Sequence, residues 1–183
     1  MLKNDLAYII TGAPGSGKTL LKKALFEKGI KGFEEPARAI IAEQRCIGGQ
    51  GIYDRDTALF KELILSRAIS QYQRAVKENQ IIIFDRGIPD IIAYAKCFNL
   101  PAGAEQSASE YYRYNQTVFF APSWKAIYRN DEERKLRFEQ SEEFGDNLKQ
   151  VYQRQGYKIV ELPCVTPEQR ADFVLAHIEG NRL

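Results

Sequence analysis

Histidine and cysteine are scarce in this sequence. A single histidine, His177, stands late in the chain, and the three cysteines, Cys46, Cys97 and Cys164, are far apart and match no metal-binding spacing. This scarcity argues against histidine-based catalytic triads and zinc sites. We expect His177 to be structural and the cysteines to be small buried hydrophobic residues of a reducing compartment.

Long apolar runs and a dominant charge are also missing. No apolar run is long enough to span a membrane. The N-terminal residues "MLKNDLAYII" contain too short an apolar run for a signal peptide. The chain has 26 basic and 24 acidic residues, so its net charge is only +2. Such a balance does not favour a nucleic-acid or membrane-surface partner. We expect a soluble cytoplasmic protein, whose oligomeric state stays open.

Short apolar runs alternate with amphipathic stretches throughout the 183 residues, a length that suits one domain, residues 1–183. Alternation of this kind favours an α/β fold in three layers with a mainly parallel sheet. Residues 100–106 are predicted to form a loop, and Gly145 can interrupt the helix in which it lies. The predicted strands are 7–11, 30–33, 80–85, 117–122 and 157–163, and the predicted helices are 18–28, 36–45, 54–79, 88–98, 107–115, 131–155 and 167–180.

Residues 12–19 read "GAPGSGKT" and fit the phosphate-binding pattern GxxxxGK[ST] without a mismatch. A loop that wraps phosphates with backbone N–H groups needs glycine wherever a side chain would block the approach. Lys18 is predicted to reach the β- and γ-phosphates of ATP, and the Thr19 hydroxyl to bind Mg²⁺. We expect the nucleotide to contact Gly12, Ala13, Pro14, Gly15, Ser16, Gly17, Lys18, Thr19 and Leu20.

Asp85 and Arg86 follow the most apolar of the predicted strands. The carboxyl ends of parallel strands are where open α/β sheets bind ligands. There Asp85 can hold Mg²⁺ or take a proton from an attacking hydroxyl, although it can also cap the next helix. Arg86 can neutralise phosphate charge or orient an acceptor, the alternative being a solvated surface arginine. Asp90 is a weaker candidate that can equally be a helix N-cap.

The segment "FEEPAR" places Glu34, Glu35 and Arg38 directly after the second predicted strand. An enzyme that seats a second, polar substrate could use such a set at this edge of the sheet. The alternative is a helix N-terminus enriched in acidic residues, which the helix dipole favours.

The segment "YRNDEERKLRFEQ" carries Arg129, Arg134 and Arg137 after the fourth predicted strand. These arginines can form a lid over the nucleotide, at about residues 125–140, that stabilises the phosphoryl group during transfer. The alternative is a solvated helix in which acidic and basic residues alternate.

Five segments in order, "ITGAPGSGKT", "EEPAR", "FDRGIPD", "RNDEER" and "GYKIVELP…TPEQRADFVL", resemble the small bacterial AAA-type ATPase-like family of P-loop proteins. That family is similar to the nicotinamide riboside kinase domain and, more distantly, to deoxynucleoside and nucleoside monophosphate kinases. The resemblance covers nearly the whole chain and implies a five-stranded parallel sheet in the order 2-3-1-4-5. It also implies an acid–arginine pair at Asp85 and Arg86, an acid–proline pair near the acceptor at Glu35 and Pro36, and lid arginines at Arg129 and Arg134.

Two functions fit these residues. The first is an ATP- and Mg²⁺-dependent phosphotransferase for a small nucleoside-, nucleotide- or vitamin-like acceptor, which is held in a cleft beside the phosphate loop. The second is an ATPase or nucleotide-gated binding protein that switches a partner interaction. No NKxD-type guanine motif is present, which favours ATP over GTP. In the first function the catalytic residues are Lys18, Asp85, Arg86, Arg129 and Arg134, the acceptor residues are Glu35, Arg38 and Arg86, and the metal ligands are Thr19 and Asp85.

Overall fold

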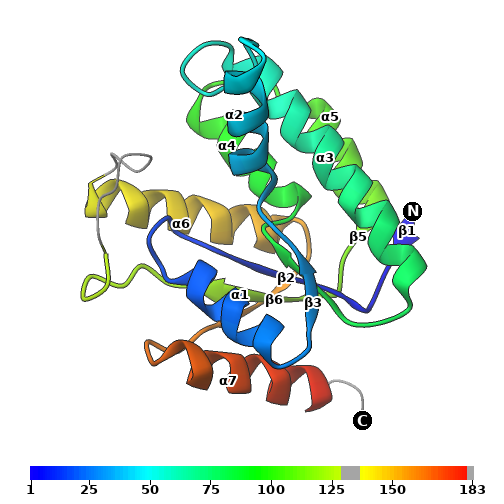
Figure 1. The fold of residues 1–183 in the computed structure, drawn as a ribbon, viewed down its shortest axis with the longest axis vertical. Coiled ribbons are helices and arrows are strands. Elements are labelled where there is room, and N and C mark those ends of the chain that lie inside the picture. The colour runs from blue at the N-terminus through cyan, green and yellow to red at the C-terminus, as the bar shows by residue number, and fades with distance from the viewer. Residues whose placement is uncertain (129–136, 181–183) are drawn as a thin grey trace.

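Five parallel strands form the centre of the computed structural model, which describes residues 1–128 and 137–180 (Figure 1). Numbered among themselves along the chain, these strands have the order 2-3-1-4-5, as the resemblance implied. A separate two-stranded parallel sheet, β1 (Leu2–Lys3) with β5 (Tyr112–Arg113), was not predicted. The main sheet runs β3 (Lys31–Phe33), β4 (Ile82–Asp85), β2 (Ala7–Gly12), β6 (Thr117–Ala121) and β7 (Lys158–Glu161).

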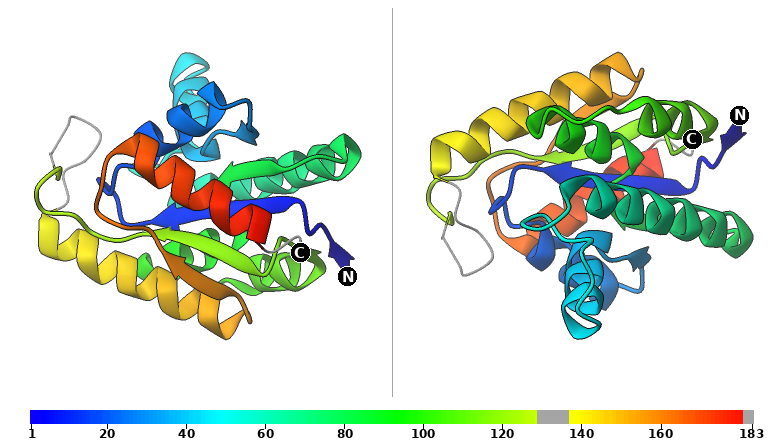
Figure 2. Two further views of the ribbon diagram at one scale, coloured as in Figure 1. Left: turned by 90° about the horizontal axis from the view of Figure 1, so that it is seen from below. Right: turned by 90° about the horizontal axis from the view of Figure 1, so that it is seen from above.

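Helices cover both faces of the sheet, as Figures 1 and 2 show. Along β2, Ala7 and Ile9 point into one buried cluster, while Tyr8 and Ile10 point into another. Both faces of this central strand are therefore shielded from water, which is why its sequence is a continuous apolar run. The second cluster packs against α1 (Lys18–Glu27) and α7 (Pro167–Gly180); the first packs against α3 (Thr57–Glu78), α4 (Ile88–Cys97), α5 (Gly103–Tyr111) and α6 (Phe138–Arg154).

Capping residues explain where several helices begin. α2 (Pro36–Cys46) begins with proline, whose missing N–H has no partner to lose in the first turn. α3 begins at Thr57 rather than residue 54, because the Asp56 side chain accepts a hydrogen bond from the Leu59 N–H. Before α7, Thr166 Oγ1 accepts a hydrogen bond from the Gln169 N–H at 3.3 Å and so caps the start of that helix.

The predicted loop at 100–106 and helix at 107–115 have the wrong bounds: only residues 100–102 lie outside a helix, and only residues 107–111 of the predicted helix are helical. α5 already begins at Gly103, and Tyr112 and Arg113 leave the helix to pair with β1. Pairing with a strand about 110 residues away in the sequence overrides local helical pattern, and no local signal reports it.

The helix after β6 is not interrupted at Gly145. Its described part begins at Phe138, and the predicted residues 131–136 lie outside the described chain. A Cβ at position 145 would lie 3.3 Å from the Cβ of Ala13, so this glycine lets α6 pack closely against the phosphate loop. The glycine therefore serves a packing contact rather than a break.

The expectation of buried cysteines is also wrong, since Cys46, Cys97 and Cys164 are all exposed. Cys46 and Cys97 are the last residues of α2 and α4, where the helices leave the core. The ring of His177 packs against the ring of Phe173, and its Nδ1 lies 2.9 Å from the Phe173 carbonyl oxygen. Within residues 1–128 and 137–180, no helix is long and apolar enough to cross a membrane.

Candidate active site

The phosphate loop connects β2 to α1, and its glycines are required by its geometry. Gly12 has φ +139°, and a Cβ there would lie only 2.1 Å from the carbonyl oxygen of Ala121 in β6. Gly17 has φ +82° and is the N-cap of α1. Both positions use a backbone conformation that side chains disfavour. The helix N-terminus behind Gly17 is a favourable place for anions.

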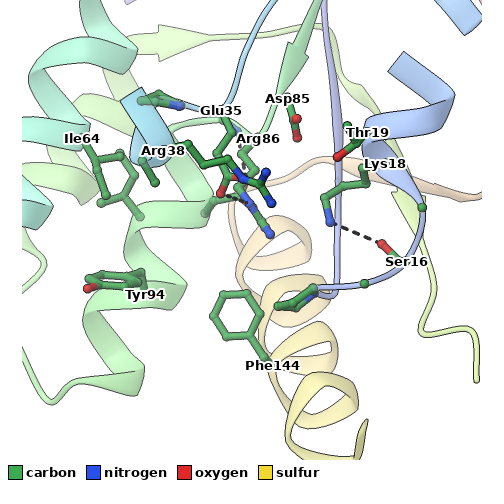
Figure 3. A pocket seen from close by; sticks show the side chains of 18 of the residues that line it. Ser16, Lys18, Thr19, Glu35, Arg38, Ile64, Asp85, Arg86, Tyr94 and Phe144 are labelled. Atoms are coloured by element: carbon green, nitrogen blue, oxygen red, sulfur yellow. Dashed lines mark hydrogen bonds and ion pairs between the residues drawn. The ribbon is translucent and has the colours of Figure 1, made fainter. Parts of the chain in front are cut away.

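Lys18 is buried beneath the loop. Its Nζ donates hydrogen bonds to the carbonyl oxygens of Gly12 and Ala13, at 3.0 and 2.8 Å. It also donates to Ser16 Oγ at 3.3 Å (Figure 3). Burial is the main cause that lowers the pKa of Lys18 to about 7, and the nearby Arg86 charge lowers it as well, while the surrounding carboxylates act in the opposite direction. A bound phosphate group would place a negative charge beside the Lys18 amine and so favour its charged, ammonium form.

Asp85 lies buried at the carboxyl end of β4, where it is paired with Lys22 of α1. Lys22 Nζ donates to Asp85 Oδ2 at 2.8 Å and also to Glu34 Oε2. The other oxygen, Asp85 Oδ1, is buried without a hydrogen-bond partner in the described part of the chain. Burial opposes the charge of Lys22, but Asp85 and Glu34 outweigh it and raise the pKa of Lys22. The N-cap of the next helix, α4, is Gly87, so Asp85 does not cap it.

Arg86 follows in a left-handed conformation, with φ +70°. Its Nε donates to Glu35 Oε1 at 2.8 Å, and its Nη1 donates to Asp90 Oδ1 at 3.0 Å and to the Gly12 carbonyl oxygen at 3.3 Å. Burial disfavours its charge, but the carboxylates of Glu35, Asp90 and Asp85 together outweigh burial and raise the pKa of Arg86 above its usual range. The interpretation as a solvated surface arginine is wrong, and the strained backbone is typical of functional sites.

Asp90 serves as a junction between elements rather than as a helix N-cap. It is the third residue of α4, and its Oδ2 accepts a hydrogen bond from the N–H of Gly87, which is the N-cap. Its side chain also accepts hydrogen bonds from Thr11 Oγ1, at 2.6 Å, and from the Tyr152 hydroxyl. With four donors, including Arg86, this carboxylate is fully engaged by the protein itself.

A cavity of about 1540 Å³ joins the phosphate loop to the residues after β3 and β4. Glu35, Arg38, Asp85 and Arg86 all line it, as the sequence led us to expect. Figure 3 shows Asp85 between Thr19 and Lys18 on one side and the group of Glu35, Arg38 and Arg86 on the other. The cavity wall includes Pro14, Gly15, Ser16, Gly17, Lys18, Thr19 and Leu20, whereas Gly12 and Ala13 lie behind it and bind Lys18.

The predicted lid cannot be placed in the same way. Arg129 and Arg134 lie outside the described residues, and Arg137 is the N-cap of α6 rather than a residue within a helix. The lid role of these arginines stays a prediction.

Sequence reasoning missed Lys22 and Arg170. Lys22 stands one helical turn after Lys18, so its position on the same face of α1 was a usable signal. Arg170, in α7, is almost completely buried; its Nη1 donates to the Ser16 carbonyl oxygen at 2.7 Å, and its guanidinium lies over the Trp124 ring. This hydrogen bond holds the backbone of the phosphate loop in place. The residues around Arg170 in the sequence do not distinguish it from an arginine on a solvated helix face.

The donor set around the loop fits a magnesium ion that arrives with a nucleotide. The exposed Thr19 hydroxyl and the unpartnered Asp85 Oδ1 both belong to residues of the cavity wall, and oxygen is the ligand that Mg²⁺ prefers. The remaining ligands would be phosphate oxygens and water. In the described residues, no group of three or more histidine, cysteine, aspartate or glutamate side chains could hold a metal alone.

A strand, a complete phosphate loop, a helix and a carboxylate on the neighbouring strand define a P-loop nucleotide-binding protein. The sequence profile of a family described as an AAA domain matches residues 7–170. The chain therefore belongs to this AAA-domain family and is a P-loop enzyme of the ATP-dependent kinase or ATPase class. No curated protein matches the sequence.

Solved structures share the fold at low sequence identity. A deoxyadenosine kinase from M. mycoides with bound dATP is 14% identical, with a TM-score of 0.62 over 94% of this chain and 99% of that one. A shikimate kinase from Acinetobacter baumannii in complex with shikimate is 14% identical, with a TM-score of 0.58 over 97% and 94% of the two chains. The NadR protein in complex with NR is 17% identical, with a TM-score of 0.69 over 95% of this chain and 50% of that one.

Proposed function

We propose that this protein is an ATP-dependent phosphotransferase that acts on a small nucleoside-, nucleotide- or vitamin-like acceptor. One observation carries the proposal: the phosphate loop shares its cavity with a second polar group, Glu35, Arg38 and Arg86, on the far side of Asp85. ATP hydrolysis needs only water as acceptor, so it would not need such a group. The kinase structures that share the fold agree with this choice.

Positioning and electrostatics would supply most of the catalysis, as in other phosphoryl transfers. The N–H groups of the loop and Lys18 would hold the ATP phosphates, and bound Mg²⁺, on Thr19 and near Asp85, would neutralise their charge. Asp85 Oδ1, which is buried without a hydrogen-bond partner among the described residues, would accept the proton of an acceptor hydroxyl that reaches it. Arg86, held by Glu35 and Asp90, would present a fixed positive charge to the transferred group. Arg129 and Arg134 are proposed to close over it.

The acceptor end of the cavity has a mixed character. Phe60 and Ile64 of α3, Tyr94 of α4 and Phe144 of α6 form apolar walls, and the Tyr94 hydroxyl is buried without a hydrogen-bond partner in the described chain. Arg38 and Arg45, seven residues apart on one face of α2, line the same cavity. These walls suit an acceptor with a planar ring, a hydroxyl group and an anionic or amide group. The proposed setting is the cytoplasm.

The proposal can be tested by thermal unfolding of the wild-type protein. The samples contain Mg²⁺, a non-hydrolysable ATP analogue and, one at a time, the compounds of a panel of nucleosides, nucleotides and vitamins. A true acceptor should raise the unfolding temperature beyond the effect of the nucleotide alone, because it binds only the folded state. It should also raise ATP turnover and become phosphorylated. The variant Arg38→Gln, which leaves the phosphate loop intact, should keep the nucleotide effect and lose most of the acceptor effect.

The ATPase alternative makes the opposite prediction. If ATP is hydrolysed at full rate without any acceptor, and no compound of the panel changes the rate, the phosphotransferase proposal fails and a nucleotide-gated function takes its place.

A further inference from the structure

Lys22 lies between two carboxylates at the edge of the active site. Its side chain is only 7% exposed, and it is paired with Asp85, which is 8% exposed, and with Glu34, which is 72% exposed. Lysine is rarely buried unless its charge is matched. Here one ammonium is matched by a buried carboxylate on β4 and a second carboxylate that follows β3.

Without Lys22, the same place would have the character of a divalent cation site. Two carboxylates would meet at the carboxyl edge of the sheet, and one of them, Asp85, has a buried oxygen without a hydrogen-bond partner in the described chain. Hard divalent cations prefer oxygen ligands of this kind. Two neighbouring carboxylates without a counter-ion also repel each other, and a bound cation would relieve that repulsion.

We infer that Lys22 is a built-in cation, which occupies the place between Asp85 and Glu34 and keeps the nucleotide-free protein from binding a divalent metal there. Mg²⁺ would then enter only with the phosphates of the nucleotide, at Thr19. This inference rests on the proposed use of MgATP, but it concerns a state without nucleotide or acceptor and can be tested separately.

The same contact makes Lys22 a positioning residue for Asp85. Lys22 engages Oδ2 at 2.8 Å and leaves the buried Oδ1 as the one oxygen of this carboxylate without a hydrogen-bond partner in the described chain. The carboxylate would thus act through one oxygen of defined direction, which suits a proton acceptor or a single metal contact better than chelation of a metal through both oxygens.

Titration of the protein with Mn²⁺, in the absence of nucleotide, tests the inference; free Mn²⁺ is measured by electron paramagnetic resonance. The variant Lys22→Met removes the charge with little change in length, and it should bind one Mn²⁺ roughly tenfold or more tightly than the wild type. The double variant Lys22→Met with Asp85→Asn should lose this gain. Lys22→Arg, which keeps the charge, should behave as the wild type. Lys22→Gln is a second neutral variant if Lys22→Met does not fold.

Lys23 offers a matched control on the same helix. Its side chain is 73% exposed and pairs weakly with Glu27, at 3.9 Å. Lys23→Met removes the same charge from the neighbouring residue and should leave Mn²⁺ binding unchanged. The inference is overturned if a folded neutral variant at position 22 gains no affinity, or if Lys23→Met gains as much. It is overturned equally if the wild type binds Mn²⁺ with a Kd well below about 1 mM without nucleotide.

Discussion

Lys18 is a residue whose charge depends on what it contacts. Its burial sets a pKa of about 7 in the protein without nucleotide, and phosphate would raise that pKa because it favours the charged form. At pH 8 most Lys18 side chains are neutral, so nucleotide binding should take up close to one proton, whereas at pH 6 the uptake should be near zero. Affinity for MgATP should therefore decrease as the pH rises above 7.

Calorimetric titration in two buffers with different heats of ionisation measures this proton uptake directly. The control is Lys18→Arg, whose guanidinium stays charged at every pH tested, so its binding should take up no proton at pH 8. Equal uptake by the wild type and this variant would mean that another group is responsible. Lys18→Ala should bind MgATP too weakly to titrate.

Asp85 offers a second test at the residue scale. Asp85→Asn keeps the shape of the side chain but cannot accept a proton, so kcat should fall by about 10²-fold or more if Asp85 is the base. The Kd for ATP should change only a few-fold, because Lys18 and the loop N–H groups hold the phosphates. Steady-state kinetics and a nucleotide titration separate the two effects. Unchanged kcat would reduce Asp85 to a partner of Lys22.

At the scale of elements, the side chain of Asp90 joins β2, α4 and α6. It accepts hydrogen bonds from Thr11 in β2, from Gly87 at the start of α4 and from Tyr152 in α6. Asp90→Ala would leave the buried Tyr152 hydroxyl and the Arg86 guanidinium without this partner. We expect it to lower the free energy of unfolding by about 3–5 kcal/mol, as loss of one partner of a buried charged pair does.

Denaturation by guanidinium chloride measures that change. Tyr152→Phe removes one donor and leaves the carboxylate satisfied by the other three, so it should cost only about 1–2 kcal/mol. A loss below 1 kcal/mol for Asp90→Ala would contradict the role of this residue as a junction.

At the scale of the whole molecule, we propose that residues 1–183 form a single domain. The two buried clusters lie on opposite faces of the same strands, because alternate side chains of β2 enter one cluster and then the other. Neither helical layer can therefore unfold without exposing strands on which the other depends. Scanning calorimetry should show one transition, with a ratio of calorimetric to van't Hoff enthalpy of about 1. Two resolved transitions would contradict the proposal.

Much of this architecture could be predicted from the sequence, because its signals are local. Continuous apolar runs indicated strands covered on both faces, and the pattern of residues 12–19 indicated a phosphate loop with Lys18 and Thr19. Placing Glu35, Arg38 and Asp85 at one edge needed only the rule that parallel strands end together. The helix predicted at 107–115 failed at its carboxyl end, because Tyr112 and Arg113 pair with distant residues of β1.

The sequence by itself determined the class of this protein: the phosphate loop and the alternation of strands and helices are written in neighbouring residues, whose conformations depend mainly on one another. Only the tertiary structure decided which charges meet. Lys22 joins Asp85 and Glu34, Arg170 reaches under Ser16, and Asp90 gathers four donors, through contacts between residues up to 154 positions apart. Burial then sets the state of each charge, since the same lysine keeps its ordinary pKa in water and has a pKa of about 7 beneath the loop.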